Sequence, residues 1–206
     1  MQPGWAEIMV PIQGIDTSKI ILEAPQKVTR PGIPTYAQDR PLSALTYNDG
    51  FIQLPCHAVL TPFLKVLSWD SSTGRLDLHV VSGTQTYQKL TLIQNYMLNM
   101  IHDHQKSWIG TMDSSTQEIR DMYQPMLVGE RLTIYLHGAN PEQKTTGRVW
   151  LWASKGWQKG ASKGSFKPGD MIRVAIRLQG ICYLIQGARV RFRLQHQTIA
   201  IYKRGA

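Results

Sequence analysis

Two basic stretches near the C-terminus decide the expected fold: residues 171–178 read Met-Ile-Arg-Val-Ala-Ile-Arg-Leu, and residues 189–194 read Arg-Val-Arg-Phe-Arg-Leu. Apolar and polar residues alternate in both, which is the period of a β-strand. Each stretch therefore predicts a strand with one apolar and one cationic face. The cationic positions are Arg173 and Arg177 in the first strand and Arg189, Arg191 and Arg193 in the second.

Residues 132–136, 148–152 and 198–202 alternate in the same way. Earlier in the chain, residues 66–69 and 76–81 flank the turn sequence Asp-Ser-Ser-Thr-Gly-Arg and predict a hairpin. The C-terminal strands follow one another too closely for crossover helices, so we expect no parallel sheet. The strand pattern predicts a small antiparallel barrel or sandwich.

Two segments predict helices. Between residues 87 and 109, apolar residues recur every three or four positions, as in an amphipathic helix. Residues 114–118 offer N-cap side chains for a second helix over 116–126, which Pro125 limits. The fold class is therefore mainly β with one or two helices (α+β). The apolar face of the 87–109 helix would pack on the sheet or pair with a second copy, which leaves a homo-oligomer open.

The domain organisation follows from composition. Residues 1–42 are rich in Pro and Gly and predict an extended arm that runs over the surface, with one short strand at 19–22. Residues 43–206 form one domain, with a helical insertion at about 87–126. A chain of 206 residues is long enough for one full core.

Charge is divided unevenly between the two parts of the chain. Residues 131–206 contain fourteen Lys and Arg but only Glu142 and Asp170 as acids, a net charge of +12. Residues 1–130 hold nine bases and twelve acids, a net charge of −3, and together the parts give the +9 of the whole protein. Such a basic half indicates a polyanionic partner, either nucleic acid or an anionic membrane surface. The basic positions lie on strands rather than on an amphipathic helix, so we expect no membrane binding.

Aromatic residues accompany these cations. In the strand at 148–152, Arg148, Trp150 and Trp152 share a face. The following loop, 153–169, repeats Lys-Gly and adds two rings that have no evident core role. Phosphates require cations, and unstacked bases require flat rings. The predicted loop contacts are Lys155, Trp157, Lys159, Lys163 and Phe166. The alternative is that the strands are merely solvated and the loop binds nothing.

Catalytic signals are weak. His102, Asp103 and His104 are adjacent on the predicted helix, where neighbouring side chains diverge by about 100° and rarely bind one metal. We expect no catalytic centre, no metal and no cofactor. Cys56 and Cys182 match no metal or redox spacing and are expected to be buried free thiols in a reducing compartment. The N-terminus lacks the features of a signal peptide, and no apolar run is long enough to span a membrane. The expected location is intracellular, nuclear or cytoplasmic, in a host cell if the protein is viral.

The segment 169–203 resembles the end of OB-fold single-stranded DNA-binding proteins of DNA viruses. In those proteins a strand closes on a Leu-x-Gly-Ile element before a short turn and a long final strand. Here Leu178, Gly180 and Ile181 hold these places, and Gly187 supplies the turn. The resemblance is confined to the C-terminal third and implies an OB-like barrel with stacking aromatics and basic loops. Many such proteins end in an acidic tail that recruits partners, whereas this chain ends Tyr-Lys-Arg-Gly-Ala.

We therefore expect a non-enzymatic, sequence-tolerant binder of single-stranded DNA that acts in replication or recombination. RNA remains an open variant of the same interpretation. The first alternative is a viral capsid or virion structural protein that contacts the packaged genome, and the second is a nuclease or an accessory domain of one.

Overall fold

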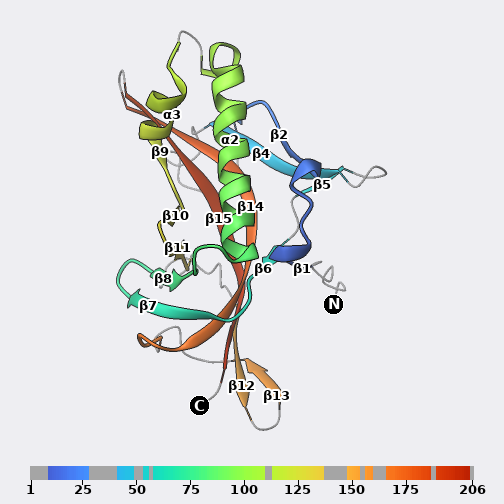
Figure 1. Cartoon of the computed structure of the whole chain (residues 1–206), viewed down its shortest axis with the longest axis vertical. Helices are drawn as coiled ribbons and strands as arrows, with labels where there is room; N and C mark the ends of the chain where they lie inside the picture. The colour runs from blue at the N-terminus through green and yellow to red at the C-terminus, as the bar shows by residue number, and fades with distance from the viewer. Residues whose placement is uncertain are drawn as a thin grey trace.

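A computed structural model describes residues 9–27, 41–48, 53–55, 58–109, 113–136, 148–153, 156–159, 166–186 and 189–204. Strands make up most of the regular structure in this part of the chain. Two α-helices lie among them, α2 (Gln85–Ile109) and α3 (Thr116–Met122) (Figure 1). The class is mainly β with two helices, as the sequence predicts.

A long antiparallel hairpin forms the spine of the sheet (Figure 1). Its strands are β14 (Met171–Gln186) and β15 (Arg189–Lys203), which pair from Ile172↔Lys203 to Gln186↔Arg189. The sequence predicts separate strands at 189–194 and 198–202, but the structure joins them into one. The three residues between them stay in the ladder, and the side chain of His196 is buried.

Two bulges interrupt this ladder. Ile199 is the extra residue on β15, between the pairs Ala175↔Ala200 and Ile176↔Thr198. Gln179 is the extra residue on β14, between Leu178↔His196 and Gly180↔Gln195. Gly180 has a φ of 143°, a conformation that favours glycine over residues with a Cβ. The Leu-x-Gly-Ile element therefore lies at a bulge inside β14.

Other strands pair with both outer edges of this hairpin. The free edge of β14 pairs with β7 (Leu64–Asp70), β6 (Ala58–Leu60) and β4 (Pro41–Asn48). The free edge of β15 pairs in parallel with β12 (Arg148–Ala153) and β9 (Tyr123–Gln124), and β13 (Gly156–Lys159) extends β12. The sheet is mixed and not closed. The expectation of a purely antiparallel barrel is therefore wrong. The short spacing of consecutive strands does not exclude parallel pairing, because β12 and β15 are not consecutive. The chain runs through β13 and β14 between them, and this connection allows β12 and β15 to point in the same direction.

The predicted hairpin at 66–81 is confirmed as β7 and β8 (Arg75–His79). Beyond β8 come β11 (Arg131–Tyr135) and β10 (Leu127–Val128). Because β8 pairs directly with β11, both helices form an insertion between two neighbouring strands. The N-cap predicted within residues 114–118 is confirmed as Ser115, which forms a capping box with Glu118. The Ser115 side chain accepts from the Glu118 backbone N–H, and the Glu118 carboxylate accepts from the Ser115 backbone N–H.

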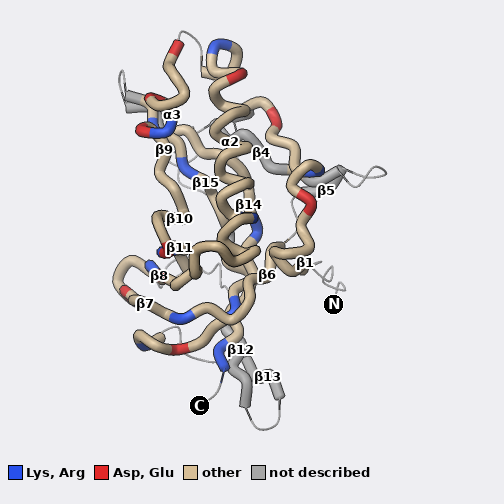
Figure 2. The backbone as a smooth tube through the Cα atoms, in the orientation of Figure 1, with Lys and Arg blue, Asp and Glu red and all other residues tan. Residues whose placement is uncertain are grey.

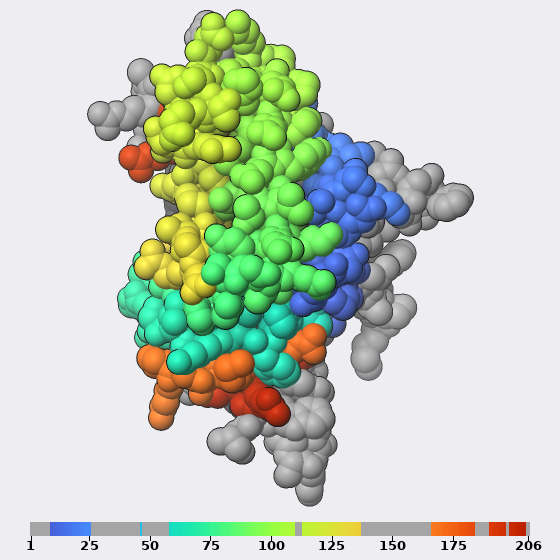
Figure 3. All heavy atoms as spheres, viewed as in Figure 1, coloured from blue at the N-terminus to red at the C-terminus, as the bar shows by residue number. Residues whose placement is uncertain are grey.

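Helix α2 lies over one face of the hairpin (Figures 1 and 3). Its buried residues, including Ile93, Met97 and Ile101, belong to the same core as Tyr183 and Phe192. The last two rings meet edge to face at 5.5 Å between centroids. The apolar face of α2 therefore packs within this chain. We call the covered side of the hairpin the helix face and the opposite side the outer face.

The N-terminal segment belongs to the same core. Its pieces are β1 (Met9–Pro11), η1 (Ile12–Gly14), η2 (Thr17–Lys19), β2 (Ile20–Leu22) and β3 (Gln26–Lys27). β1 pairs with β6, while β2, β3 and β5 (Gln53–Pro55) pair with β4. The predicted strand near 19–22 is confirmed. The prediction that this segment runs only over the surface is wrong for residues 9–27, because they pair with the sheet and contribute to its core. Its aliphatic side chains are buried: Ile12, Ile15, Ile20 and Leu22. The expected domain boundary at 42 falls inside β4, and residues 28–40 lie outside the described residues.

The substitution Ile12→Ala tests this packing. Ile12 is 1% exposed, so its truncation should lower the free energy of unfolding by about 2–5 kcal/mol. Leu92→Ala removes an aliphatic side chain that is 51% exposed and should change the same quantity by less than about 0.5 kcal/mol. Urea unfolding measures both, and equal costs would contradict the place of residues 9–22 in the core.

Glu130 ties the start of the helical insertion to the sheet. Its carboxylate accepts hydrogen bonds from the backbone N–H of Ser82 at 2.7 Å and from its hydroxyl at 2.6 Å. The other carboxylate oxygen lies 3.0 Å from Nε2 of His79. The hydrogen bonds from Ser82, helped by His79, lower the pKa of Glu130 to about 2.

This contact predicts an acid dependence of stability. A carboxyl group whose pKa falls on folding stabilises the protein above its unfolded pKa of about 4.3, and that stabilisation disappears as pH falls through the folded pKa. Thermal melts of the wild type and of Glu130→Gln should therefore differ most at neutral pH, with the wild type more stable, and should converge toward pH 2. A constant difference across this range would show that Glu130 does not act through its charge.

Candidate nucleic-acid interface

The register of the hairpin assigns the predicted arginines to one face. Cross-strand partners in an antiparallel ladder lie on the same side of a sheet. The pairs Arg173↔Tyr202 and Arg177↔Gln197 precede the second bulge, and Cys182↔Arg193, Leu184↔Arg191 and Gln186↔Arg189 follow it. The intervening pairs, such as Tyr183↔Phe192, occupy the helix face. All five arginine positions therefore share the outer face: Arg173, Arg177, Arg189, Arg191 and Arg193.

The register of β12 and β13 extends this row, and we use only their backbone here. Trp150 pairs with Tyr202 of β15 and with Lys159 of β13. Arg148 pairs with Ala200, and Trp152 pairs with Trp157. These positions belong to the same outer face as the arginines of β14 and β15. The sequence alone does not indicate that these strands are neighbours in one sheet. Lys155 and Lys163 lie outside the described residues.

Exposure agrees with this assignment on β15. The side chains of Arg191 and Arg193 are exposed, whereas Phe192 between them is 0% exposed. Leu194 is buried as well, so the predicted alternation of this strand is confirmed. Within the described residues, neither of these two arginines has an ion-pair partner. Both exposed side chains therefore contribute positive charge to the outer face.

Arg173 and Arg177 are both half-buried. Nε of Arg173 donates to the backbone carbonyl of Thr61 at 3.1 Å, and its guanidinium carbon lies 5.5 Å from the ring centroid of Phe63. These contacts fix the orientation of the Arg173 guanidinium group.

Phe166 does not belong to the interface. It is 7% exposed and packs edge to face against Trp69, with 5.4 Å between the ring centroids. The expectation that its ring lacks a core role and is free to stack on a base is therefore wrong. Phe166 precedes the turn before β14, where the backbone of β7 and residues 169–170 exchange hydrogen bonds, and its ring packs against Trp69 of β7.

Phe166→Ala should consequently act on stability. We expect the free energy of unfolding to fall by about 3–5 kcal/mol, as for other buried phenylalanines. Urea unfolding measures this loss, and the near-ultraviolet circular dichroism of Trp69 should change with it. Unchanged stability would contradict the buried position.

The outer face continues beyond the hairpin onto β7, β8 and β11. Met171 pairs with Lys65, Lys65 with His79, and His79 with Arg131, and all four are exposed or half-buried. Lys65 and Arg131 thus add cations to this face that are not among the contact residues predicted from the sequence. Figure 2 shows lysines and arginines along β7, β14 and β15, and acidic residues near the end of α2, around α3, on β7 and in the N-terminal segment. One acid of the basic half, Asp170, is paired with Lys203 at 2.6 Å.

Tyr202 is a further position that strict alternation misses. In a regular strand, Tyr202 would share a face with the other even-numbered residues of β15, such as Phe192 and Leu194. It would then lie on the face opposite to that of Arg191 and Arg193. The bulge at Ile199 reverses this relation and brings Tyr202 onto the outer face. The Ile-Ala-Ile-Tyr pattern indicates a strand but contains no signal for a bulge.

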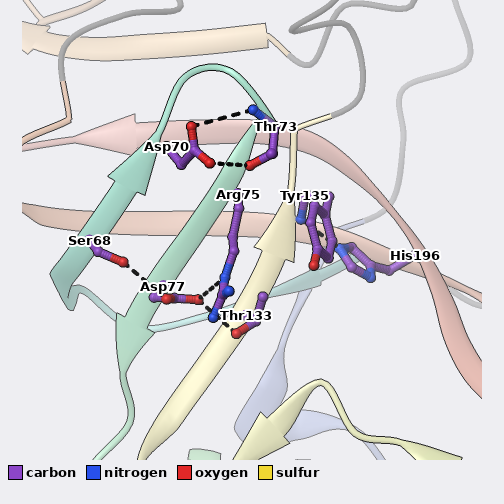
Figure 4. Close-up of polar contacts among 8 residues, drawn as sticks. All are labelled: Ser68, Asp70, Thr73, Arg75, Asp77, Thr133, Tyr135 and His196. Carbon is purple, nitrogen blue, oxygen red and sulfur yellow. Dashed lines mark hydrogen bonds and ion pairs between the residues drawn. The ribbon is translucent and has the colours of Figure 1, made fainter.

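The described acids serve structural contacts. Asp77 accepts hydrogen bonds from Thr133 at 2.7 Å, Ser68 at 3.0 Å and Arg75 at 3.1 Å (Figure 4). Burial alone would raise the pKa of Asp77, but the three hydrogen bonds together outweigh burial. The net pKa lies below its usual value, so the carboxyl group remains ionised. Asp70 accepts from Thr73 in the β7–β8 turn (Figure 4).

The two histidines near the end of α2 are also engaged: His102 contacts Asp103, and His104 stacks on Trp108. Among the described residues, no group of three or more His, Cys, Asp or Glu could hold a metal ion. Cys182 is a buried free thiol, as predicted, and Cys56 is outside the described residues.

Neither protein-family models nor curated proteins gave a match to this chain. In the part of the chain that the structure describes, no helix combines the length and apolar character needed to cross a membrane.

Proposed function

We propose that this protein binds single-stranded DNA through the outer face of its sheet, with little sequence preference and no enzymatic activity of its own. One observation carries the proposal: strand register assigns ten of the thirteen predicted contact residues to the same face, opposite helix α2. These residues combine cations with aromatic rings. That combination is typical of proteins that hold a flexible strand by its phosphates and stack on its bases.

We further propose that the protein acts in replication or recombination inside a cell. We also propose kinship with the OB-fold single-stranded DNA-binding proteins of DNA viruses, on the resemblance of residues 169–203 alone. Lys155, between β12 and β13 in sequence, and Lys163, between β13 and β14, would also contact phosphates. The same surface chemistry suits single-stranded RNA, so the binding test compares both nucleic acids.

Arg191 and Arg193 offer the sharpest test. The double substitution R191E/R193E should weaken binding to labelled oligothymidylate by about tenfold or more, because two phosphate contacts become repulsive. The log–log dependence of affinity on salt should become shallower by about 1.4, at roughly 0.7 for each phosphate contact. Fluorescence anisotropy across a salt series measures both quantities.

A matched control makes the same change of charge on the helical side of the molecule. Lys106 and Arg120 are exposed residues of α2 and α3, and K106E/R120E should alter affinity by only roughly twofold at physiological salt. Equal losses in the two variants would reduce binding to a general effect of net charge and contradict a defined face. Equal affinity for oligothymidylate, oligouridylate and duplex DNA would contradict single-strand selectivity. Failure of the wild type to bind at low salt would overturn the proposed function.

A further inference from the structure

Tyr202 and Arg173 are direct partners in the β14–β15 ladder. Partners of this kind have Cβ atoms about 4.5–5.5 Å apart, and here both residues belong to the outer face. Both are half-buried, so each presents part of its side chain to solvent and holds the rest against the protein. A ring and a guanidinium group therefore lie side by side on the proposed binding surface.

The N-terminal half of the chain holds both groups in place. The carbonyl of Thr61 accepts from Nε of Arg173, and the ring of Phe63 lies beneath the guanidinium group. The hydroxyl of Tyr202 lies 3.6 Å from Sδ of Met9 in β1. An arginine has five N–H donors, and the contact to Thr61 uses only the one on Nε. The donors on its two terminal nitrogens have no hydrogen-bond acceptor among the described residues.

This arrangement matches the needs of one nucleotide. Guanidinium donors suit a phosphate, because their planar geometry allows two parallel hydrogen bonds to its oxygens. A tyrosine ring offers a flat surface on which any base can stack. Side chains that are already ordered lose little conformational entropy when a ligand binds.

We propose that Tyr202 and Arg173 form a nucleotide subsite, in which a base stacks on the Tyr202 ring and the adjoining phosphate binds the terminal nitrogens of Arg173. This inference rests on the proposed function and adds to it a residue, Tyr202, that the predicted site lacks. The subsite recognises the base only through its flat face, so it tolerates any sequence.

A comparison of two probes separates stacking from charge. One probe is labelled oligothymidylate, and the other is an abasic deoxyribose-phosphate oligomer of the same length. Tyr202→Leu should weaken binding to oligothymidylate by about tenfold and leave binding to the abasic oligomer within about twofold. Arg173→Met should weaken binding to both probes by similar factors, because it removes a phosphate contact. Tyr202→Phe keeps the ring and should bind both probes as the wild type does.

The ratio of the two affinities is measured on one preparation, so a partly unfolded variant does not distort it. An unchanged ratio in Tyr202→Leu would overturn the stacking role, even if both affinities fell. If Tyr202→Leu behaves as the wild type while R191E/R193E fails to bind, the subsite is wrong and the proposed function stands. Absence of wild-type binding to either probe would overturn both proposals.

Discussion

The antiparallel register between β14 and β15 determines which side chains of the hairpin enter the core and which lie on the outer face. On the helix face, Phe192, Tyr183 and Ile201 are at most 2% exposed, and burial of such side chains is the main force that favours folding. A slip of one residue would exchange the two faces and turn the arginines toward α2. Burial of unpaired guanidinium groups costs several kcal/mol each, so the hydrophobic contacts also fix where the cations lie.

The two halves of the chain, so different in charge, have complementary roles. The nearly neutral first half supplies α2, the β7–β8 hairpin and the N-terminal segment, which together cover one face and brace the other. Its contacts with the basic half include Thr61 and Phe63 against Arg173. A further contact joins β11 to β15: Tyr135 donates its backbone N–H to Nε2 of His196 at 3.1 Å (Figure 4), and its carbonyl accepts from Thr198 at 3.3 Å. Polar side chains of β15 thereby continue the ladder where the strands themselves do not pair.

Much of this architecture could be predicted from local pattern. The alternation around Phe192, the three- and four-residue spacing around Met97 and the cap at Ser115 each reflect a preference of the residues themselves. The remaining features depend on contacts distant in sequence. Parallel pairing of β12 with β15 needs a partner about fifty residues away, and the burial of Ile12 needs a core that later segments provide.

The candidate site shows the same division. The arginines of each strand could be assigned to one face, because alternation is local. Their union with Tyr202 could not, because it depends on the bulge at Ile199. The prediction for Phe166 is wrong because an aromatic ring in a Lys- and Gly-rich segment resembles a binding residue. The burial of Phe166 depends on its contact with Trp69, which is distant in sequence.

Helices α2 and α3 belong to one continuous segment of the chain, inserted between β8 and β11, which pair directly with each other. His79 at the end of β8 pairs with Arg131 at the start of β11, so these two strands meet directly across the insertion. Substitutions on the exposed side of α2 can therefore leave the pairing of β8 with β11 and the outer face unchanged. The part of α2 that must persist is its apolar stripe, represented by Ile93, Met97 and Ile101. The surface of the helical side can therefore change in sequence without a change in the outer face.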